Sequence, residues 1–402
     1  MAQKRLLLLG GLRYLLPVIE EAHRMGIYVI TADYLPNNIA HKYSDEYINV
    51  SIIDKEAVLE AAKALRIDGI LSHAVDPGVV TAAFVAEQMG LPYQCSYEAA
   101  CILQDKAEFR QFLRNNGFNC PFSKGYSDFQ SALQDIGLYK LPIIVKPVDS
   151  AGSKGVSKVA SIEALRPAIE LALSESHCKR FIIEEFLEKS GFSAGSESFF
   201  INGKLVFNAF YDQMFDLEAL NPYTPSAEIW PSSMSGIKLS EVKNELQRLS
   251  YLLGFRTGLF NIEFRLCSDG KLYLMEVSPR AGGNRLAEII KYATDTDVIS
   301  AEINKAVGIR IETMKEPQYN GSYAIQVLYS YTGGLFSELE ISKSFEDKYV
   351  IEKELRVSYG DCIYPFNAAN SSIGTLFLHF KDRTELEDVL AGINNYVHIV
   401  CQ

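Results

Sequence analysis

Residues 261–280, NIEFRLCSDGKLYLMEVSPR, predict a β-hairpin that carries two acidic side chains on one face. Asp269-Gly270 lies between two apolar runs, and this dipeptide is a strong signal for a two-residue hairpin turn. In the register that such a turn sets, Glu263 lies directly opposite Glu276. Opposed side chains have Cβ atoms about 5 Å apart, so two like charges repel unless cations lie between them. Because carboxylate oxygens suit Mg²⁺, the pair predicts a metal site; the alternative is a solvated hairpin with two unrelated surface acids.

The residues that follow extend the acidic face of this hairpin. Ser278 and Arg280 come two and four residues after Glu276, so in a strand they share its face. The next residues, Gly282-Gly283-Asn284, resemble a loop that binds an anion. We therefore expect metal-binding and anion-binding groups together at this end of the hairpin.

A second candidate anion site lies upstream, where an apolar strand is followed by a glycine loop. Lys146 is the one charge in the run LPIIVKP, residues 141–147, and a buried charge needs a partner of opposite sign. The alternative is a lysine whose ammonium group reaches solvent at the strand end. In the loop DSAGSKG, residues 149–155, glycines let backbone N–H groups approach a phosphate, and further donors come from Ser150, Ser153 and Lys154. The loop lacks the GxxxxGKS/T spacing, which excludes a P-loop NTPase.

Two other segments carry charges in suggestive surroundings. Lys106 opens a predicted helix that begins at Asp105. The apolar strand FIIEEFL, residues 181–187, holds the adjacent acids Glu184 and Glu185. Adjacent strand positions face opposite sides, so one of the two acids points inward and needs a partner. The sequence leaves open which one it is.

The first hundred residues alternate strand and helix, which predicts βαβ units with a parallel sheet. The expected strands are 5–9, 28–32 and 69–72, and the expected helices are 13–24, 54–65 and 79–89. Gly10-Gly11 with Asp33 invites a dinucleotide-binding interpretation, but the full GxGxxG pattern is absent and a simple glycine turn is favoured. From residue 105 the pattern changes to α+β with hairpins. After about residue 309 we expect strands 322–330 and 374–379 and a helix 384–394.

Composition limits the class of protein. The chain has 402 residues, which favours two to three domains. A net charge of −11 argues against nucleic acid or an anionic membrane as a partner. The seven cysteines never form a CxxC pair, and the only apolar run near the start is four leucines at residues 6–9. These features predict a soluble protein with reduced thiols and a cytoplasmic location.

Taken in order, these motifs resemble the ATP-grasp superfamily, which includes biotin carboxylase, carbamoyl phosphate synthetase, D-alanine–D-alanine ligase and the L-amino acid ligases. The resemblance rests on the segments 105–106, 145–147, 149–155, 184–187, 261–263 and 276–280. It implies an α/β and α+β fold with a pre-ATP-grasp Rossmann-like domain at 1–104 and an ATP-grasp domain at 105–308. A mobile lid subdomain would span about 120–187, and a small C-terminal α+β domain would span 309–402.

The resemblance also implies roles for single residues. ATP phosphates would be held by Lys106 and by Lys146, which also lies near the adenine. The lid loop over the triphosphate would include Ser150, Gly152, Ser153, Lys154 and Gly155. The adenine hinge would be lined by Glu184, Glu185, Phe186 and Leu187, and Glu197 would face the ribose or the substrate. Mg²⁺, with Mn²⁺ as an alternative, would be bound by Glu263, Glu276 and Ser278. Many members of the superfamily have asparagine at the position of Ser278. Arg280 and Lys146 are the expected catalytic residues, and Arg280 would bind the γ-phosphate and the developing acyl phosphate.

The activity that the resemblance implies is ADP-forming ligation of a carboxylate to an amine through an acyl phosphate. A bicarbonate-activating carboxylase or a carbamoyl-phosphate-synthetase-like enzyme is the alternative, although the chain has no second copy of the motifs. A non-catalytic nucleotide-binding module is a third possibility. The expected partners are small-molecule carboxylate and amine substrates, without nucleic acid or membrane, in a chain compatible with a homodimer. The aromatic and proline-rich residues 211–235 either frame the substrate or simply pack.

Overall fold

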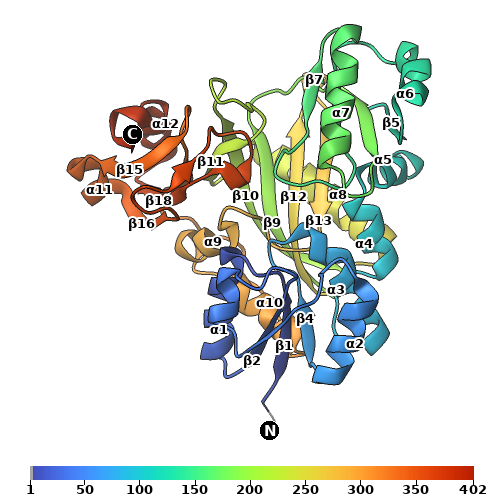
Figure 1. Ribbon diagram of the computed structural model, residues 1–402, viewed down its shortest axis with the longest axis vertical. Coiled ribbons are helices and arrows are strands. Elements are labelled where there is room, and N and C mark those ends of the chain that lie inside the picture. Colours follow the sequence, from blue (N-terminus) through green and yellow to red (C-terminus); the bar gives the residue numbers. More distant parts are fainter. Residues whose placement is uncertain (1–2) are drawn as a thin grey trace.

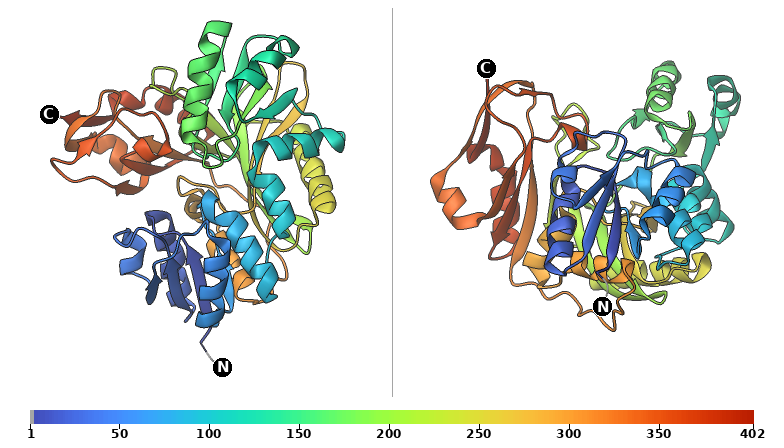
Figure 2. Two further views of the ribbon diagram at one scale, coloured as in Figure 1. Left: turned by 45° about the vertical axis from the view of Figure 1, so that its right-hand side comes forward. Right: turned by 60° about the horizontal axis from the view of Figure 1, so that its bottom comes forward.

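Four sheets organise residues 3–402 of the computed structural model (Figure 1). Residues 1 and 2, the first two of the predicted N-terminal domain, lie outside the described residues. Figures 1 and 2 show the blue N-terminal region and the green and teal lid beside the largest sheet, with the red C-terminal region at one end of that sheet. In Figure 1 the lid lies at the top, the C-terminal region at the left and the N-terminal region at the bottom.

The N-terminal sheet is parallel in the strand order β3-β2-β1-β4, as the alternation of strands and helices predicts. Its strands are β1 (Arg5–Leu9), β2 (Tyr28–Ala32), β3 (Glu46–Ile48) and β4 (Gly69–Leu71), flanked by α1 (Leu16–Arg24), α2 (Lys55–Leu65) and α3 (Asp76–Met89). The three-residue β3 is too short to be recognised from sequence, and α3 begins three residues earlier than expected. A Cβ at Gly11 would lie within 2.6 Å of Asn38, so this glycine serves close packing of the turn.

The lid is a four-stranded antiparallel sheet in the order β5-β8-β6-β7. Its strands are β5 (Ser123–Tyr126), β6 (Ile143–Pro147), β7 (Ser157–Val159) and β8 (Phe181–Glu185). Its helices are α6 (Phe129–Asp135) and α7 (Leu165–Glu175), whose apolar faces pack on the strands to form a core of their own. Two helices precede it, α4 (Tyr97–Gln104) and α5 (Lys106–Asn115). Asp105 caps α5 by accepting from the N–H groups of Ala107 and Glu108 at 2.8 and 3.1 Å.

The largest sheet has the strand order β13-β12-β9-β10-β11-β14-β18-β16. Its strands are β9 (Ser193–Ile201), β10 (Lys204–Phe215), β11 (Pro225–Trp230), β12 (Gly258–Leu266), β13 (Leu272–Ser278), β14 (Ser322–Leu328), β16 (Val350–Leu355) and β18 (Gly374–Phe380). Because β11 pairs with β14, the sheet runs across the expected boundary at residues 308 and 309. The C-terminal region therefore continues the sheet on which the central region is built.

Helices and a small sheet complete the chain. The helices are α8 (Gly236–Leu253), α9 (Leu286–Thr294), α10 (Val298–Ala306), α11 (Lys343–Tyr349) and α12 (Arg383–Ala391), and the small sheet joins β17 (Cys362–Ile363), β15 (Gly334–Ile341) and β19 (Val397–Cys401). Within residues 3–402 no helix combines the length and apolar character needed to span a bilayer. All seven cysteines, each within this range, are unpaired thiols.

The hairpin of β12 and β13 reaches the predicted pairing by an unpredicted route. The turn is closed by Cys267 N–H donating to the Lys271 carbonyl at 3.0 Å, with Gly270 at φ 77°, so three residues form the loop instead of two. This shifts the register by one residue, and an irregularity between Glu263 and Phe264 shifts it back. Glu263 therefore lies opposite Glu276, as predicted, because the two shifts cancel.

Candidate active site

Lys146 is held inside the lid by a three-residue ion network. Its Nζ lies 2.6 Å from Glu184 Oε2, and Arg110 Nε lies 2.6 Å from Glu184 Oε1. Glu184 is thus the inward acid that the sequence left undetermined. Burial alone would raise the pKa of Glu184, but Arg110 and Lys146 lower it to about 2. The pKa of Lys146 is lowered by burial and by the positive charges of Arg110 and Lys106, although Glu184 raises it. An anion bound here would therefore offset the repulsion among the three cations.

Lys106 connects the glycine loop with the hairpin. It is the first residue of α5, and its Nζ donates to the Ser150 carbonyl at 2.9 Å. The same nitrogen lies 3.3 Å from Glu276 Oε2. Burial would lower the pKa of Lys106, but Glu276 and Asp76 raise it, so the ammonium group stays charged. Two residues predicted to bind nucleotide and metal are therefore in direct contact.

The glycine loop, residues 149–155, is held by hydrogen bonds at its start and near its tip. At its start the Asp149 carboxylate accepts from Ser176 Oγ and Cys178 N–H, both at 2.8 Å. Toward its tip, Ser153 Oγ donates to the Tyr223 carbonyl at 2.9 Å. Gly152 and Gly155 have φ of 67° and 69°, which favours glycine, while Lys154 is exposed and reaches solvent. This geometry suits a flap that covers a ligand.

The predicted hinge continues from β8 at the edge of the lid. Glu185 exchanges two hydrogen bonds with Phe122: its N–H donates to the Phe122 carbonyl, and its Oε2 accepts from the Phe122 N–H, both at 2.9 Å. Lys158 Nζ lies 3.8 Å from the centre of the Phe186 ring. Glu185, Phe186 and Leu187 are all half-buried, so the segment presents backbone and side chains at a surface.

The two carboxylates of the hairpin differ in their electrostatic surroundings. Burial and the neighbouring Glu276 raise the pKa of Glu263. Burial would also raise the pKa of Glu276, but Lys106 and Arg280 lower it. Within residues 3–402 no three acidic, histidine or cysteine side chains form a metal-binding cluster. A metal ion at this pair would therefore need further oxygen ligands from a bound phosphate compound.

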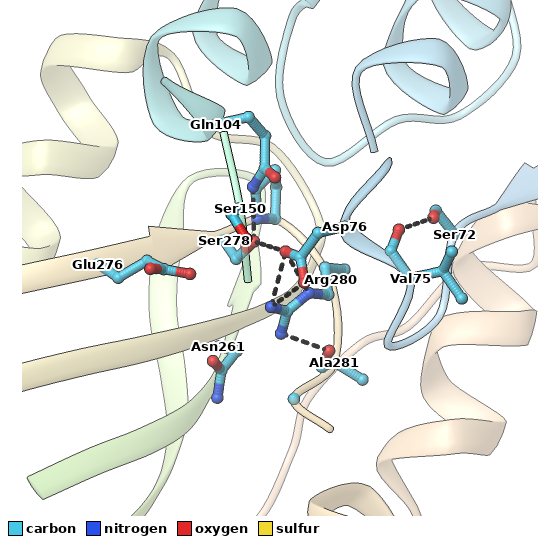
Figure 3. A network of polar contacts seen from close by, with 12 residues as sticks. Ser72, Val75, Asp76, Gln104, Ser150, Asn261, Glu276, Ser278, Arg280 and Ala281 are labelled. Atoms are coloured by element: carbon cyan, nitrogen blue, oxygen red, sulfur yellow. Dashed lines mark hydrogen bonds and ion pairs between the residues drawn. The ribbon is translucent and has the colours of Figure 1, made fainter. Parts of the chain in front are cut away.

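Arg280 is clamped by the N-terminal region (Figure 3). Its Nε and Nη2 donate to Asp76 at 2.7–2.9 Å, and its Nη1 donates to the Ala281 carbonyl at 2.8 Å. Asp76 also accepts from Ser278 Oγ at 3.0 Å, and Gln104 Nε2 donates to the same hydroxyl at 2.6 Å. The Ser278 hydroxyl thus donates to Asp76 and accepts from Gln104, which leaves one of its two lone pairs for a metal ion.

Glu197 is fully buried on β9 beside this cluster. Its Oε1 accepts from Asn261 Nδ2 at 2.7 Å and from the Gly282 N–H at 3.0 Å. Burial raises the pKa of Glu197 to about 8. The residue therefore ties the hairpin to the loop that follows Arg280.

Sequence reasoning missed Arg110, Asp76 and Gln104. One signal existed for Arg110: it lies between Phe109 and Leu113 on the apolar face of α5, where an unpaired charge would be costly. Asp76 and Gln104 carry no such signal, because only the packing of the N-terminal region on the hairpin brings them to Ser278 and Arg280.

Comparison with known proteins identifies the central region. The ATP-grasp domain family matches residues 139–288, which hold Lys146, the glycine loop, both hairpin acids and Arg280. The chain carries an ATP-grasp domain. The match leaves the N-terminal and C-terminal regions outside, and these are covered by the comparisons with whole proteins.

Whole proteins similar to this ATP-grasp chain include several ligases and transferases. A formate-dependent phosphoribosylglycinamide formyltransferase from Mannheimia succiniciproducens is 25% identical over 280 residues, 68% of each chain. An L-amino acid ligase from Bacillus licheniformis has a TM-score of 0.81 at 19% identity, with all of both chains covered. The biotin carboxylase domain of Hydrogenobacter thermophilus 2-oxoglutarate carboxylase, solved with MgADP, ADP and bicarbonate, has a TM-score of 0.74 at 16% identity, covering 100% of this chain and 91% of that one. These structural likenesses establish that the fold extends over the whole chain.

Proposed function

We propose that this ATP-grasp ligase activates a small-molecule carboxylate as an acyl phosphate, which an amine then attacks to form an amide, with ADP and phosphate as the other products. One observation carries the proposal. Lys106 touches both the glycine loop and Glu276, so the candidate phosphate-binding and metal-binding groups form one continuous site.

ATP would lie between the lid and the largest sheet. Lys146 and Lys106 would bind its phosphates, and the loop that includes Ser150, Gly152, Ser153, Lys154 and Gly155 would cover them. Residues 184–187 would border the adenine, with Glu184 acting through Lys146, to which it is bound at 2.6 Å. The mutual repulsion of Lys106, Lys146 and Arg110 supports this, because a triphosphate would offset it.

The hairpin acids fit a divalent cation. Glu263 and Glu276 would hold Mg²⁺, or Mn²⁺ in its place, and Ser278 would join them through the lone pair that its bonds to Asp76 and Gln104 leave free. When bound, Mg²⁺ would neutralise the negative charge on the phosphate oxygens while the phosphoryl group is transferred. Lys106 keeps Glu276 ionised, so one of the two acids is ready to bind a cation in the empty protein.

Arg280 would bind the transferred phosphoryl group and the carboxylate that receives it. Asp76 fixes the plane of its guanidinium group by a two-point contact, which holds the remaining N–H directions in place. Closure of the glycine loop would exclude water from the acyl phosphate until the amine attacks. The roles of Arg280 and Lys146 are thus to position and stabilise the phosphoryl group.

The reaction class is tested by phosphate release from Mg²⁺–ATP with libraries of carboxylates and amines. We expect release only when both an acid and an amine are present, together with ADP. Release with bicarbonate in place of the acid would favour the carboxylase-like alternative. No release under any combination, with ATP still bound, would favour a non-catalytic nucleotide-binding module.

Nucleotide binding is tested separately by calorimetry. We expect Lys146→Ala to weaken ATP affinity at least tenfold, because a buried charge-assisted contact to phosphate is lost. Lys204→Ala, at an exposed lysine of β10, is the matched control and should bind ATP like the wild type. Equal affinity in wild type and Lys146→Ala would remove Lys146 from the phosphate site.

The proposal extends to the oligomeric state of the protein and to its location in the cell. We expect a homodimer, which light scattering of the purified protein tests directly. A cytoplasmic location agrees with seven unpaired thiols.

A further inference from the structure

Glu228 is a buried acid for which the proposed mechanism has no use. It lies on β11 with 3% of its surface exposed. Its Oε1 accepts from Asn284 Nδ2 at 2.9 Å, and its Oε2 has no hydrogen-bond partner among residues 3–402. A buried carboxylate oxygen without a donor is costly whether or not it is protonated, because a proton on Oε2 would itself lack an acceptor. The structure therefore leaves one hydrogen-bonding position open at this residue.

The register of the sheet places Glu228 on the same face as the hairpin acids. Glu228 pairs with Gln213, which lies two residues from Tyr211 on β10. Tyr211 pairs with Gly195, and Gly195 pairs with Glu263. Strand neighbours across a sheet share a face, as do residues two apart, so Glu228 and Glu263 face the same side.

The loop after Arg280 leads from the phosphate site to Glu228. Gly282 N–H is bound to Glu197, and Asn284 is bound to Glu228. A Cβ added to Gly283, between them, would meet no heavy atom within 4 Å, and Gly283 is exposed, so this side of the loop faces solvent. Arg280 lies two residues before Gly282 and is directed to Asp76. The loop thus links Arg280, where the acyl phosphate would form, to the residue that holds Glu228.

An organic cation suits this position better than a metal ion. Glu228 does not join Glu263 and Glu276 as a three-acid metal-binding cluster within residues 3–402. Its one fixed partner, Asn284 Nδ2, is a donor and cannot coordinate a cation alongside it. A primary ammonium group carries three donors and a positive charge, which would satisfy Oε2 and compensate the buried carboxylate.

We propose that Glu228 binds the ammonium group of a substrate, so that the ligase acts on an amino acid. Glu228 Oε2 would accept an N–H bond from it, while Asn284 holds Oε1 in place. The inference rests on the proposed function in that the ammonium compound is one of the two substrates. Burial raises the pKa of Glu228 to about 8, so the bound cation would stabilise the ionised carboxylate.

The test compares ammonium compounds with matched compounds that lack the ammonium group. Thermal shift and calorimetry would use the twenty common L-amino acids in the presence of Mg²⁺–ADP, each beside its 2-hydroxy analogue, such as L-alanine beside L-lactate. We expect at least one amino acid to bind and its hydroxy analogue to bind about tenfold to hundredfold more weakly, the range of a charged hydrogen bond. Equal binding of the two analogues, or no binding by any amino acid, overturns the inference.

Two variants assign the effect to Glu228. Glu228→Gln keeps the shape and the bond from Asn284, and it should lose the same factor in amino-acid affinity while binding Mg²⁺–ADP like the wild type, which also reports correct folding. Glu218→Gln, at an exposed acid nearby, is the control and should change neither affinity. Wild-type amino-acid affinity in Glu228→Gln overturns the inference.

The outcomes for the site and for the reaction are separable. Glu228-dependent amino-acid binding without phosphate release under any condition would contradict the proposed function and leave the ammonium site standing. Phosphate release that depends on an acid without an ammonium group and on an uncharged nitrogen compound would support the function and overturn the ammonium site.

Discussion

Glu263 and Glu276 face each other across the hairpin, but neutralising them one at a time should have opposite effects on stability. Glu276 is paired with Lys106 at 3.3 Å, and their side chains are 23% and 16% exposed. Glu263 forms no ion pair with any residue in the range 3–402, and burial and the proximity of Glu276 raise its pKa. We therefore expect Glu276→Gln to destabilise the ligand-free protein and Glu263→Gln to leave it unchanged or stabilise it.

The magnitude follows from the two distances. At an effective dielectric constant of about 20, unit charges 3.3 Å apart attract by about 5 kcal/mol, whereas two carboxylates on opposed strand residues, whose Cβ atoms are about 5 Å apart, repel by about 3 kcal/mol. Glu276→Gln loses the first and relieves the second, so its free energy of unfolding should fall by about 2 kcal/mol. Glu263→Gln relieves the repulsion and loses weaker attractions to Lys106 and Arg280, so its free energy of unfolding should change by about 0 to +2 kcal/mol.

The assay is thermal unfolding of both variants with and without Mg²⁺–ATP. A domain of this size moves by about 2–4 °C per kcal/mol, and the two variants differ by about 2–4 kcal/mol, so without ligand Glu263→Gln should melt about 4–16 °C above Glu276→Gln. Both variants should lose most of the ligand shift, which is about 2.7 kcal/mol for the wild type at a hundredfold excess over Kd. In a Lys106→Met background the two variants should melt at the same temperature, because the positive charge that pairs with Glu276 is gone.

Two results would refute this reasoning. If Glu276→Gln without ligand is as stable as Glu263→Gln, Lys106 does not compensate Glu276 and the description of the pair is wrong. If either variant keeps a wild-type Mg²⁺–ATP shift, that acid is not a metal ligand.

Two further changes test the surroundings of the site. In Glu184 the pKa falls from an ordinary value of 4.5 to about 2, so its ionised form contributes up to about 3 kcal/mol of stability above pH 4.5, and this is lost as the pH falls toward 2. Urea unfolding should therefore show the advantage of wild type over Glu184→Gln shrinking below pH 4.5; an advantage that stays constant down to pH 3 would contradict the charge assignment. Asp76→Asn removes the anionic partner of Arg280 and should lower kcat by about tenfold or more with little change in the Mg²⁺–ATP thermal shift, since it affects orientation at the transferred phosphate. Steady-state kinetics beside that shift checks this, and an equal loss of ATP binding would place Asp76 in the nucleotide site instead.

Sequence predicted the parts of the site that depend on local pattern. The apolar run around Lys146 indicated a buried charge, and the structure places Glu184 beside it. The acidic pair was predicted correctly although the turn was not, because the irregularity after Glu263 cancels the extra loop residue. The alternation of side chains along a strand predicts which residues share a face, and two register shifts of one residue each leave the pairing of Glu263 with Glu276 unchanged. The same rules could not predict the length of the loop.

What sequence could not predict are contacts between regions far apart in the chain. Asp76 lies 204 residues before Arg280, and Glu228 lies 56 residues before Asn284; neither spacing has a repeating pattern that local periodicity could reveal. In each case a buried charge on one element is satisfied by a different element. The sequence can indicate that a partner is needed, as for Lys146, but the packing decides which residue supplies it. For Glu228 the packing supplies a donor to only one of the two carboxylate oxygens, and the unpartnered oxygen is the reason to look for a substrate with a positive charge.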